Sequence, residues 1–347
     1  MDWFASGIKN EFEFEMLDPW LKSSRGTLDV YSCSISEGYY TDAKAQADIE
    51  CDGAQYIENS AIRVWHIATL GEETVRECIG TFIPDTQSEK LENEQSILTL
   101  SMMHPLDKLA TDCRCGDSGV STSTNIAQWV QDRIQGAGCN ANISPALIAS
   151  GRTFPSAWVW EHGETVLSAI QSAADACNYQ VGADAAGNVT FYPYTVPSAR
   201  SVSFEFPEGS LSITMPEVKI STNDIINCVN VKATKDDVTL VARAQVAATH
   251  PWHFSKIGRN YAKNYEESQM DDFTQAAVNA KAAYYLAQND DTTRKWEATC
   301  LYVPIRCGDV VRFKTGDGSA EAVAMVQQRK ITCDAQMEMD LVLDEVI

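Results

Sequence analysis

The 347-residue sequence is poor in basic residues and in histidine. It has 27 Lys and Arg against 48 Asp and Glu, and only five His, so its net charge is -21. A surface with this charge repels phosphate backbones and acidic membranes. The imbalance is greatest in residues 1–104, which hold 19 acidic and 7 basic residues and carry -12 of the total charge.

Long apolar runs are also absent. No uncharged segment is long enough for a transmembrane helix, and residues 1–10 lack the apolar core that follows basic residues in a signal peptide. We therefore expect a protein that is made and folded in the cytoplasm, with no membrane insertion. A chain of this length with 44% hydrophobic residues exceeds one ordinary core, so we expect two or three domains.

The sequence has 11 cysteines, an odd number, and no Cys-x-x-Cys motif. It therefore does not predict a zinc ribbon or a zinc finger. Most of the cysteines lie within apolar patterns, as Cys78 does in residues 75–83, where a thiol packs as a small apolar group. We expect them to be buried and reduced. The close pair Cys113 and Cys115 is the candidate for an inter-subunit disulfide.

Residues 27–104 have the short apolar alternation of β-strands. Two predicted strands, 62–67 and 75–83, flank the polar turn at residues 71–73 and form an antiparallel hairpin. A further strand is predicted at 97–103. Residues 37–52 are so polar that we expect a long surface loop there.

The apolar period changes to that of helices after His104. A short helix is predicted after the cap candidates at residues 121–124, and a longer one over 164–177. Predicted strands at 179–181 and 189–192 follow and form a hairpin. These elements predict a compact α/β unit.

β patterns return after Pro197, which suggests that the α/β unit is inserted into the first β domain. Strands are expected in this order: 202–206, 211–215, 226–231, 239–246, 296–303, 310–313, 322–326 and 337–343. The strongest helix pattern, residues 268–288, interrupts them, with small Ala positions that indicate close packing on a sheet.

Motifs for catalysis or metal binding are scarce. A proline between His250 and His253 removes helical spacing, so a structural loop is favoured over a loop metal site. The segment 116–119, Gly-Asp-Ser-Gly, is similar to the nucleophile segment of chymotrypsin-like proteases but lacks its second glycine and its proline, and it suits a turn. No Walker loop or Gly-x-Gly-x-x-Gly is present. We expect no catalytic, cofactor-binding or metal-binding residues.

Two further patterns have alternative interpretations. Carboxylates at residues 11, 13 and 15 alternate with apolar residues, which is typical of a strand with one wet face, although paired carboxylates also serve glycosidases. Trp158 and Trp160 beside Glu161 would suit a sugar-binding platform, yet alternating aromatic residues in a strand usually pack locally.

The order of these elements resembles that of the central hub proteins of bacteriophage tail tips and baseplates. The likeness covers nearly the whole chain, although each piece is a degenerate apolar pattern. The segments that carry it are Ile62-Arg63-Val64-Trp65, Gly80-Thr81-Phe82-Ile83, Glu164-Thr165-Val166-Leu167, Cys177-Asn178-Tyr179, Gly187-Asn188-Val189-Thr190-Phe191, Asn227-Cys228-Val229-Asn230-Val231, Pro304, Gly308-Asp309-Val310-Val311, and residues 337–343.

The resemblance implies an α+β fold with two tube-like antiparallel β-barrel domains and an inserted small α/β domain. The first barrel would take residues 1–104 plus 197–232, the insert 105–196, and the second barrel 233–347 with helix 268–288. Three copies would then imitate a six-fold ring that joins the six-fold tail tube to a three-fold spike. The implied partners are further copies of this chain, the tail tube or distal tail protein, the spike or tip protein, and the tape-measure protein.

The resemblance places the protein in the virion tail tip or baseplate, as part of the channel through which double-stranded DNA passes without specific binding. Acidic residues on an inner wall would keep DNA from sticking, although net charge also keeps an assembly subunit soluble. Two other functions stay open: a tail-associated peptidase or glycan hydrolase that degrades the cell wall, and a carbohydrate-binding adhesin that uses Trp158, Trp160 and Trp252. Because the chain ends at Ile347, after the second barrel, we expect no appended enzyme domain and no enzymatic activity.

Overall fold

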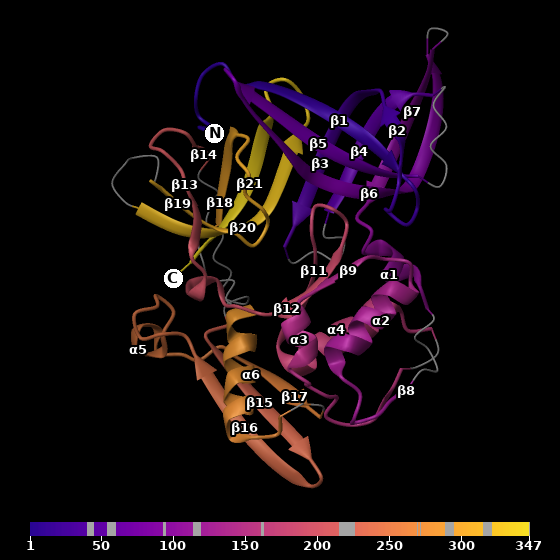
Figure 1. Cartoon of the computed structure of the whole chain (residues 1–347). Coiled ribbons are helices and arrows are strands. Elements are labelled where there is room, and N and C mark those ends of the chain that lie inside the picture. The colour runs from indigo at the N-terminus through magenta and orange to yellow at the C-terminus, as the bar shows by residue number, and fades with distance from the viewer. Residues whose placement is uncertain are drawn as a thin grey trace.

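The computed structural model shows a mostly β protein with a few short helices (Figure 1). It contains one thirteen-stranded sheet and three small sheets of two, three and three strands. The α+β class is therefore confirmed. The structure describes residues 1–39, 45–53, 60–92, 95–113, 119–160, 163–214, 226–268, 270, 272–288, 295–314 and 321–346.

The first seven strands form one half of the large sheet. They are β1 (Lys9–Leu17), β2 (Ser24–Leu28), β3 (Val30–Gly38), β4 (Ala45–Asp52), β5 (Ala61–Leu70), β6 (Glu73–Glu92) and β7 (Gln95–Met103). The predicted hairpin is confirmed, because β5 pairs antiparallel with β6 around the turn at Gly71. The alternation near the N-terminus is also that of a strand, with Phe14 buried and Glu11 exposed.

The predicted loop over residues 37–52 is wrong. β4 occupies residues 45–52 and pairs with both β3 and β7. Its apolar residues are buried and alternate with exposed polar ones, as in Ala47, Asp48 and Ile49. Such a strand, apolar on one face only, satisfies the period-2 rule. Half of the residues of β4 are polar, so its composition predicts a loop although its alternation predicts a strand.

The elements from Asp107 to Pro193 form an α/β unit with a core of its own. Its elements are α1 (Asp107–Thr111), β8 (Gly119–Val120), α2 (Ile126–Gly136), β9 (Ala141–Ile143), α3 (Pro145–Ala149), β10 (Trp158–Val159), α4 (Val166–Cys177), β11 (Tyr179–Ala183) and β12 (Val189–Pro193). The two helices predicted in this region are confirmed, with α2 ending at Gly136 and α4 at Cys177, and so is the β11–β12 hairpin. The cap of α2 is Asn125 rather than the serine and threonine cluster before it.

A third unit packs helix α6 (Gln275–Gln288) against the small sheet of β15 (Cys228–Lys235), β16 (Val238–Gln245) and β17 (Ala262–Glu267). The short helix α5 (Phe254–Ile257) lies in the connection before β17. α6 begins seven residues later than predicted because Thr274 accepts a hydrogen bond from the N–H of Ala277 and caps the first turn. β17, rich in Lys and Glu, was not predicted.

The other half of the large sheet consists of β13 (Val202–Glu205), β14 (Ser212–Thr214), β18 (Lys295–Leu301), β19 (Val310–Lys314), β20 (Glu321–Thr332) and β21 (Glu338–Glu345). The described strands of residues 197–232 do not pair with the first seven strands, which differs from their predicted place in the first barrel. β13 pairs with β19, β14 pairs with β18, and β15 belongs to the third unit. β13 and β14 are short, and their local sequence does not specify a partner about 100 residues away.

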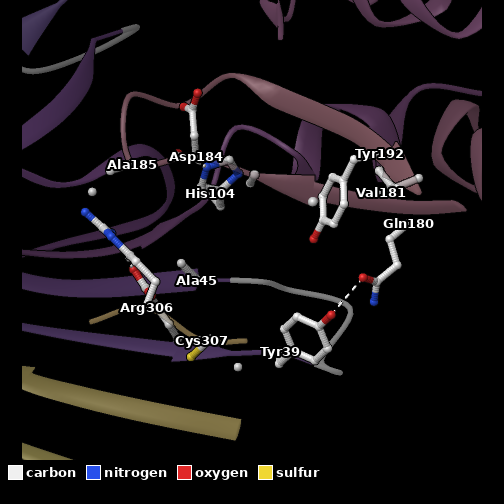
Figure 2. A pocket seen from close by; sticks show the side chains of 15 residues that line it. Tyr39, Ala45, His104, Gln180, Val181, Asp184, Ala185, Tyr192, Arg306 and Cys307 are labelled. Atoms are coloured by element: carbon white, nitrogen blue, oxygen red, sulfur yellow. Dashed lines mark hydrogen bonds and ion pairs between the residues drawn. The ribbon is translucent and has the colours of Figure 1, made fainter. Parts of the chain in front are cut away.

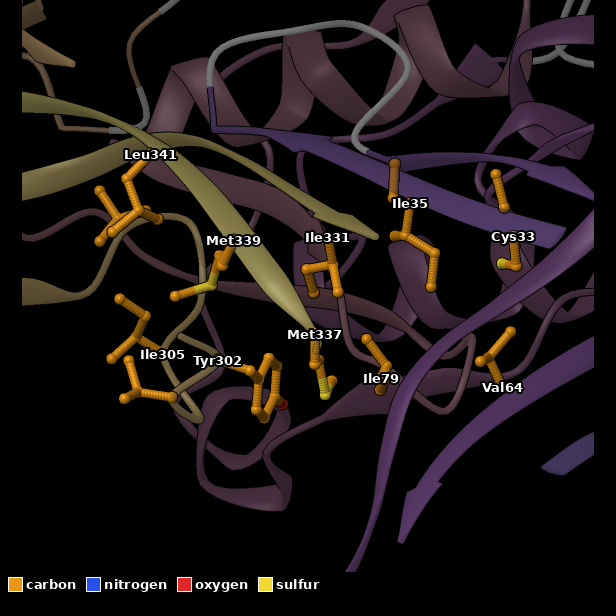
Figure 3. Close-up of a cluster of buried hydrophobic side chains, with 14 of the residues drawn as sticks. Cys33, Ile35, Val64, Ile79, Tyr302, Ile305, Ile331, Met337, Met339 and Leu341 are labelled. Carbon is orange, nitrogen blue, oxygen red and sulfur yellow. The ribbon is translucent and has the colours of Figure 1, made fainter. Parts of the chain in front are cut away.

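The two halves meet where β3 pairs antiparallel with β20, which we call the seam. Over the described residues the pairing runs openly from β14 to β2, so the strands form one extended sheet rather than two closed barrels. A single hydrophobic core serves both halves, and residues such as Ile35, Val64, Met337 and Leu341 meet in it (Figure 3). Burying this shared core stabilises the two halves as one body.

Candidate functional surfaces: an acidic sheet face and a buried junction

One face of the large sheet is covered with carboxylate and hydroxyl groups, and we call it the acidic face. It is formed by the side chains that alternate with the core residues of five neighbouring strands, β4, β3, β20, β21 and β18. Its polar members are Ser32, Ser34, Ser36, Gln46, Asp48, Glu50, Lys295, Glu297, Thr299, Gln328, Lys330, Thr332, Glu338 and Asp340, and the apolar Val342 and the exposed Leu301 lie on the same face.

The strand register shows that this face continues across the seam. Ser36 of β3 lies opposite Gln46 on one side and Lys330 on the other, and Lys330 lies opposite Asp340 of β21. Asp340 in turn faces Thr299 of β18. Directly opposite residues in antiparallel strands project to the same side. The face therefore spans both halves of the sheet without a break.

Neighbouring hydroxyl groups hold two of its carboxylates in place. Ser32 Oγ donates to Glu50 Oε2 at 3.0 Å, and Thr299 Oγ1 donates to Asp340 Oδ1 at 2.8 Å. The face has five carboxylates and two lysines, so its net charge is negative. A pocket of about 420 Å³ opens on this face, and Ser36, Glu297, Lys330 and Asp340 are among the residues that line it. The acidic face as a whole is a broad, mostly polar surface with a net negative charge, and such a surface repels polyanions.

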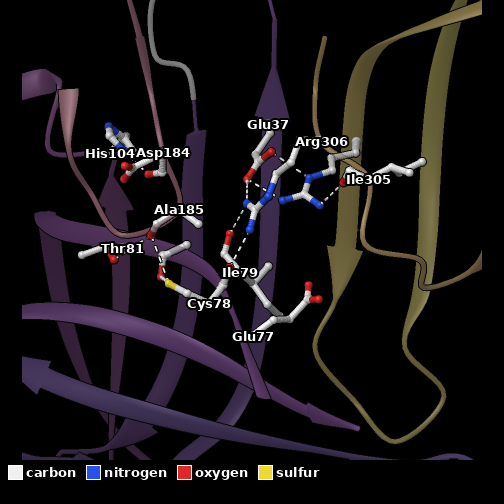
Figure 4. A network of polar contacts seen from close by, with 12 residues as sticks. Glu37, Glu77, Cys78, Ile79, Thr81, His104, Asp184, Ala185, Ile305 and Arg306 are labelled. Carbon is white, nitrogen blue, oxygen red and sulfur yellow. Dashed lines mark hydrogen bonds and ion pairs between the residues drawn. The ribbon is translucent and has the colours of Figure 1, made fainter. Parts of the chain in front are cut away.

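A network of buried charges lies behind the seam (Figure 4). Arg329 of β20 makes two bonds to the carboxylate of Glu37 of β3, at 2.7 and 2.8 Å, and its side chain is fully buried. Arg306 adds a third contact to Glu37 at 3.3 Å. The arginines also donate to backbone carbonyls of Cys78, Ile79 and Ile305. These bonds connect β3, β6 and the C-terminal half of the sheet.

The pKa of Glu37 reflects this pairing. Burial alone would raise the pKa of Glu37, but the guanidinium groups of Arg329 and Arg306 hold it below its ordinary value. Burial raises the pKa of Glu77, which accepts a hydrogen bond from Tyr302, and the charges of Arg306 and Arg329 offset only part of this rise. The Glu37 carboxylate is therefore the charged partner that compensates the buried Arg329 and the partly buried Arg306.

The α/β unit docks onto the first half of the sheet through the turn of its β11–β12 hairpin (Figure 4). The carbonyl of Ala185 accepts from Thr81 Oγ1 at 2.8 Å and from Cys78 Sγ at 3.1 Å. The carbonyl of Ala186 accepts from Arg63 at 3.0 Å. The turn carbonyls thus accept hydrogen bonds from side chains of β5 and β6, and these bonds fix the position of the α/β unit on the sheet.

A pocket of about 300 Å³ lies beside this docked turn (Figure 2). Its walls include Tyr39, His104, Gln180 and Arg306, which come from both halves of the sheet and from the hairpin. Tyr39 donates to Gln180 Oε1 at 2.7 Å across it. His104 is buried, its Nδ1 accepts from the N–H of Leu106 at 3.0 Å, and burial lowers its pKa to about 4. The polar groups of this wall are bonded to one another, which is typical of a joint between units.

Replacing Gly187 with alanine tests the docked turn. Gly187 has φ +85°, and a Cβ there would lie 2.9 Å from Leu21 Cδ1 and 3.1 Å from Thr81 Cβ. Gly71, in the β5–β6 turn, also has positive φ but has no neighbour within 4 Å. We expect Gly71→Ala to cost about 1 kcal/mol from backbone strain alone. Gly187→Ala should cost about 1–3 kcal/mol more by overpacking. Equal losses in denaturant unfolding would contradict the docking contact.

The aromatic residues considered for a sugar platform lie in the core of the α/β unit. Trp158 and Trp160 are each 5% exposed, and Trp160 stacks on Trp129 with ring centroids 4.7 Å apart. They pack against Phe154 as well. A buried cluster presents no ring face to a sugar, so the local-packing interpretation holds for this pair. Glu161 lies outside the described residues.

The histidine pair stabilises its own loop. His250 is buried and accepts from the N–H of Trp252 at 3.2 Å, and His253 caps α5 by accepting from the N–H of Ser255. Among the described residues, no group of three or more His, Cys, Asp or Glu is placed to hold a metal ion. The Gly-Asp-Ser-Gly segment at 116–119 falls outside the described residues except for its last glycine.

Most of the described cysteines are buried, as predicted; these are Cys33, Cys51, Cys139, Cys177, Cys228 and Cys300. Cys113 is exposed and free, whereas Cys115 lies outside the described residues. In the part of the chain that the structure describes, no helix is both long and apolar enough to span a bilayer.

Solved structures with the same arrangement come from prophages and bacteria. A tail protein from Neisseria meningitidis MC58 superposes with a TM-score of 0.65 at 12% identity, over 96% of each chain. The 43 kDa tail protein of prophage MuSo2 from Shewanella oneidensis gives 0.62 at 14% identity, over 95% of this chain and 98% of that one. The chain has the fold of bacteriophage tail proteins.

A third tail protein, gp18 of a Listeria monocytogenes EGD-e prophage, matches with a TM-score of 0.56 at 10% identity over 96% of this chain and 94% of its own. No protein-family model and no curated protein matches the sequence. The tail-protein fold was thus predicted from the order of elements and is confirmed by structure alone. The sequence predicts only part of the acidic face, because β4, which carries Asp48 and Glu50, has the polar composition of a loop.

Proposed function

We propose that this protein is a non-enzymatic structural hub of a phage or phage-derived tail tip or baseplate. Three copies form a ring in which each chain contributes two tube-like modules, so that a trimer presents six near-equivalent faces to the six-fold tail tube. The first module is residues 1–104, and the second is built from β13, β14 and β18–β21. The α/β unit over residues 105–196 and the third unit decorate the ring.

The observation that carries this proposal is the continuity of the acidic face across the seam. A channel wall shared by two modules has to be one continuous surface, and the registers of β4, β3, β20, β21 and β18 supply such a surface, which is polar except at Val342 and Leu301. Its carboxylates would repel the phosphates of double-stranded DNA and let the genome slide past unbound. The low-identity matches to tail proteins support the same assignment through the fold.

In this proposal the ring joins the tail tube or distal tail protein to the spike or tip protein, and the tape-measure protein passes through it. The chain is made in the cytoplasm of the host bacterium and ends in the virion. Contacts of about 2,000 Å² or more per interface are needed for such an obligate ring. The open sheet edges at β2 and β14 supply backbone groups for part of them.

The test reverses charge on the acidic face. Particles carrying Asp48→Lys with Asp340→Lys, one change in each half of the sheet, should assemble normally but release DNA at least several-fold more slowly, because lysines bind the passing phosphates. High salt should restore the rate. The matched control is Glu266→Lys with Asp272→Lys, two exposed acidic residues of the third unit.

Two results would contradict the proposal. One is identical DNA release by the wild type and both double variants. The other is light scattering that finds only stable monomers, with or without tube partners. Clearing of cell walls by the purified chain in zymography would instead indicate a wall-degrading enzyme, and specific binding on a glycan array would indicate an adhesin.

A further inference from the structure

Two cysteines face each other across the seam. Cys33 lies on β3, and Cys333 follows the last residue of β20. The register pairs Ser34 with Thr332, which places Cys33 directly opposite Cys333. The N–H of Cys333 donates to the carbonyl of Cys33 at 2.9 Å, so the ladder extends through this pair.

Both side chains project to the core side of the sheet. Cys33 is 4% exposed and belongs to the shared core, and Cys333 is partly buried against the same core. Directly opposite residues in a hydrogen-bonded antiparallel pair have Cα atoms about 5.5 Å apart, which lies within the span of a disulfide. The Cys333 thiol is near enough to Cys33 to help raise the pKa of Cys33. A bond between them needs rotation about the side-chain torsions and an approach of the two strands by about 1 Å, because the Cβ atoms of a hydrogen-bonded pair lie about 5.5 Å apart and those of a disulfide about 3.5–4.5 Å.

The other cysteines of the region lack such a partner. Cys51 on β4 lies opposite Val30, and Cys300 on β18 lies opposite Met339. Cys78 donates to the carbonyl of Ala185. Each of these thiols therefore packs as an ordinary small core group. The pair at the seam differs because the two sulfur atoms come from opposite ends of the chain and meet at the only strand pair that joins the two halves of the described sheet.

We propose that Cys33 and Cys333 form a reversible disulfide that locks the seam, with a small disulfide such as oxidised glutathione as the oxidant. The more exposed Cys333 loses its proton and its thiolate attacks one sulfur of the oxidant. This gives a mixed disulfide and one glutathione thiolate, which takes up the proton. Cys33, after losing its proton, then attacks the sulfur of Cys333, and the second glutathione leaves as its thiol. The protein loses two electrons and two protons, and the oxidant gains them.

The order of attack follows from the surroundings of the two thiols. The neighbouring Cys333 thiol and burial both raise the pKa of Cys33 well above its ordinary value, so Cys33 is a poor first nucleophile. The second step is therefore the slow one. The dithiol persists in a reducing cytoplasm and closes after transfer to an oxidising medium. This device depends only on the seam and stands whether or not the chain forms a hub.

The experiment uses the purified full chain, incubated with oxidised glutathione and then alkylated, digested and mapped by mass spectrometry without reduction. We expect a cross-linked peptide pair that contains Cys33 and Cys333, with the loss of two free thiols and a thermal midpoint several degrees higher. Dithiothreitol should reverse all three changes. The same treatment in denaturant should spread the pairing over several of the 11 cysteines.

The variants Cys33→Ala and Cys333→Ala should each abolish the cross-link and the rise in midpoint, whereas Cys113→Ser, at an exposed free thiol, should keep both. Because Cys33→Ala removes core volume, Cys333→Ala provides the milder test. Complete alkylation of both thiols in the treated wild type would overturn the proposal. So would glutathione that stays on Cys333 without transfer to Cys33.

Discussion

Replacing Glu37 with glutamine is expected to lower the free energy of unfolding by about 3–5 kcal/mol. The change leaves Arg329, whose side chain is fully buried, without its charged partner and also removes a contact to Arg306. An uncompensated charge in the core costs far more than the lost hydrogen bonds alone. Denaturant titration followed by circular dichroism measures the loss.

The control for this prediction is an exposed pair with similar geometry. Arg312 and Glu205 lie 2.7 Å apart on the surface, with side chains 39% and 65% exposed. Glu205→Gln should cost no more than about 1 kcal/mol. The double variant Glu37→Met with Arg329→Met should recover about half of the loss or more, because it removes both buried charges. A Glu37→Gln protein as stable as the Glu205→Gln protein would disprove the network's role.

Acid should weaken the fold between pH 6.5 and pH 4 because two buried histidines resist protonation. Burial lowers the pKa of His66 and of His104 from 6.5 to about 4. In the unfolded chain each takes up a proton near pH 6.5, so the unfolded state binds more protons throughout this interval and stability falls with pH. Each shift corresponds to at most about 3 kcal/mol.

The variant His66→Phe isolates one of these contributions. His66 is fully buried, its ring lies among Phe12, Tyr302 and Trp3, and its Nε2 contacts Asn10 Oδ1 at 2.9 Å. Phenylalanine keeps the ring packing and cannot titrate. The loss of stability between pH 6.5 and pH 4 should shrink by up to about 3 kcal/mol in this variant. An unaltered pH dependence in His66→Phe would refute this assignment.

Local signals were sufficient for elements whose partners are close in sequence. The β5–β6 hairpin, α4 and the β11–β12 hairpin each follow from a period and a turn. Pairings over long distances were not predictable in the same way. β13 and β14 pair with strands about 100 residues later, and nothing in their three or four residues selects those partners.

In the candidate surfaces, too, residues with a local sequence signal were predictable and residues paired over a long distance were not. The alternation in β4 was available in the sequence, and weighing it above composition would have revealed the outward row of Asp48 and Glu50. The Glu37–Arg329 pair had no such signal, because 292 positions separate its two members and either residue alone suits an exposed position. The fold family could be recognised because an ordered set of weak patterns is more specific than any one of them.

The seam has a consequence for synthesis on the ribosome. β3 is finished within the first 38 residues, yet its partner β20 begins at residue 321. Until then one edge of β3 has no native strand beside it, and free edges promote aggregation. Closing so long a loop also slows folding. Nascent chains that terminate before residue 321 should therefore aggregate more readily than the full-length chain. Pairing of β20 with β3 covers the free edge and removes this cause of aggregation.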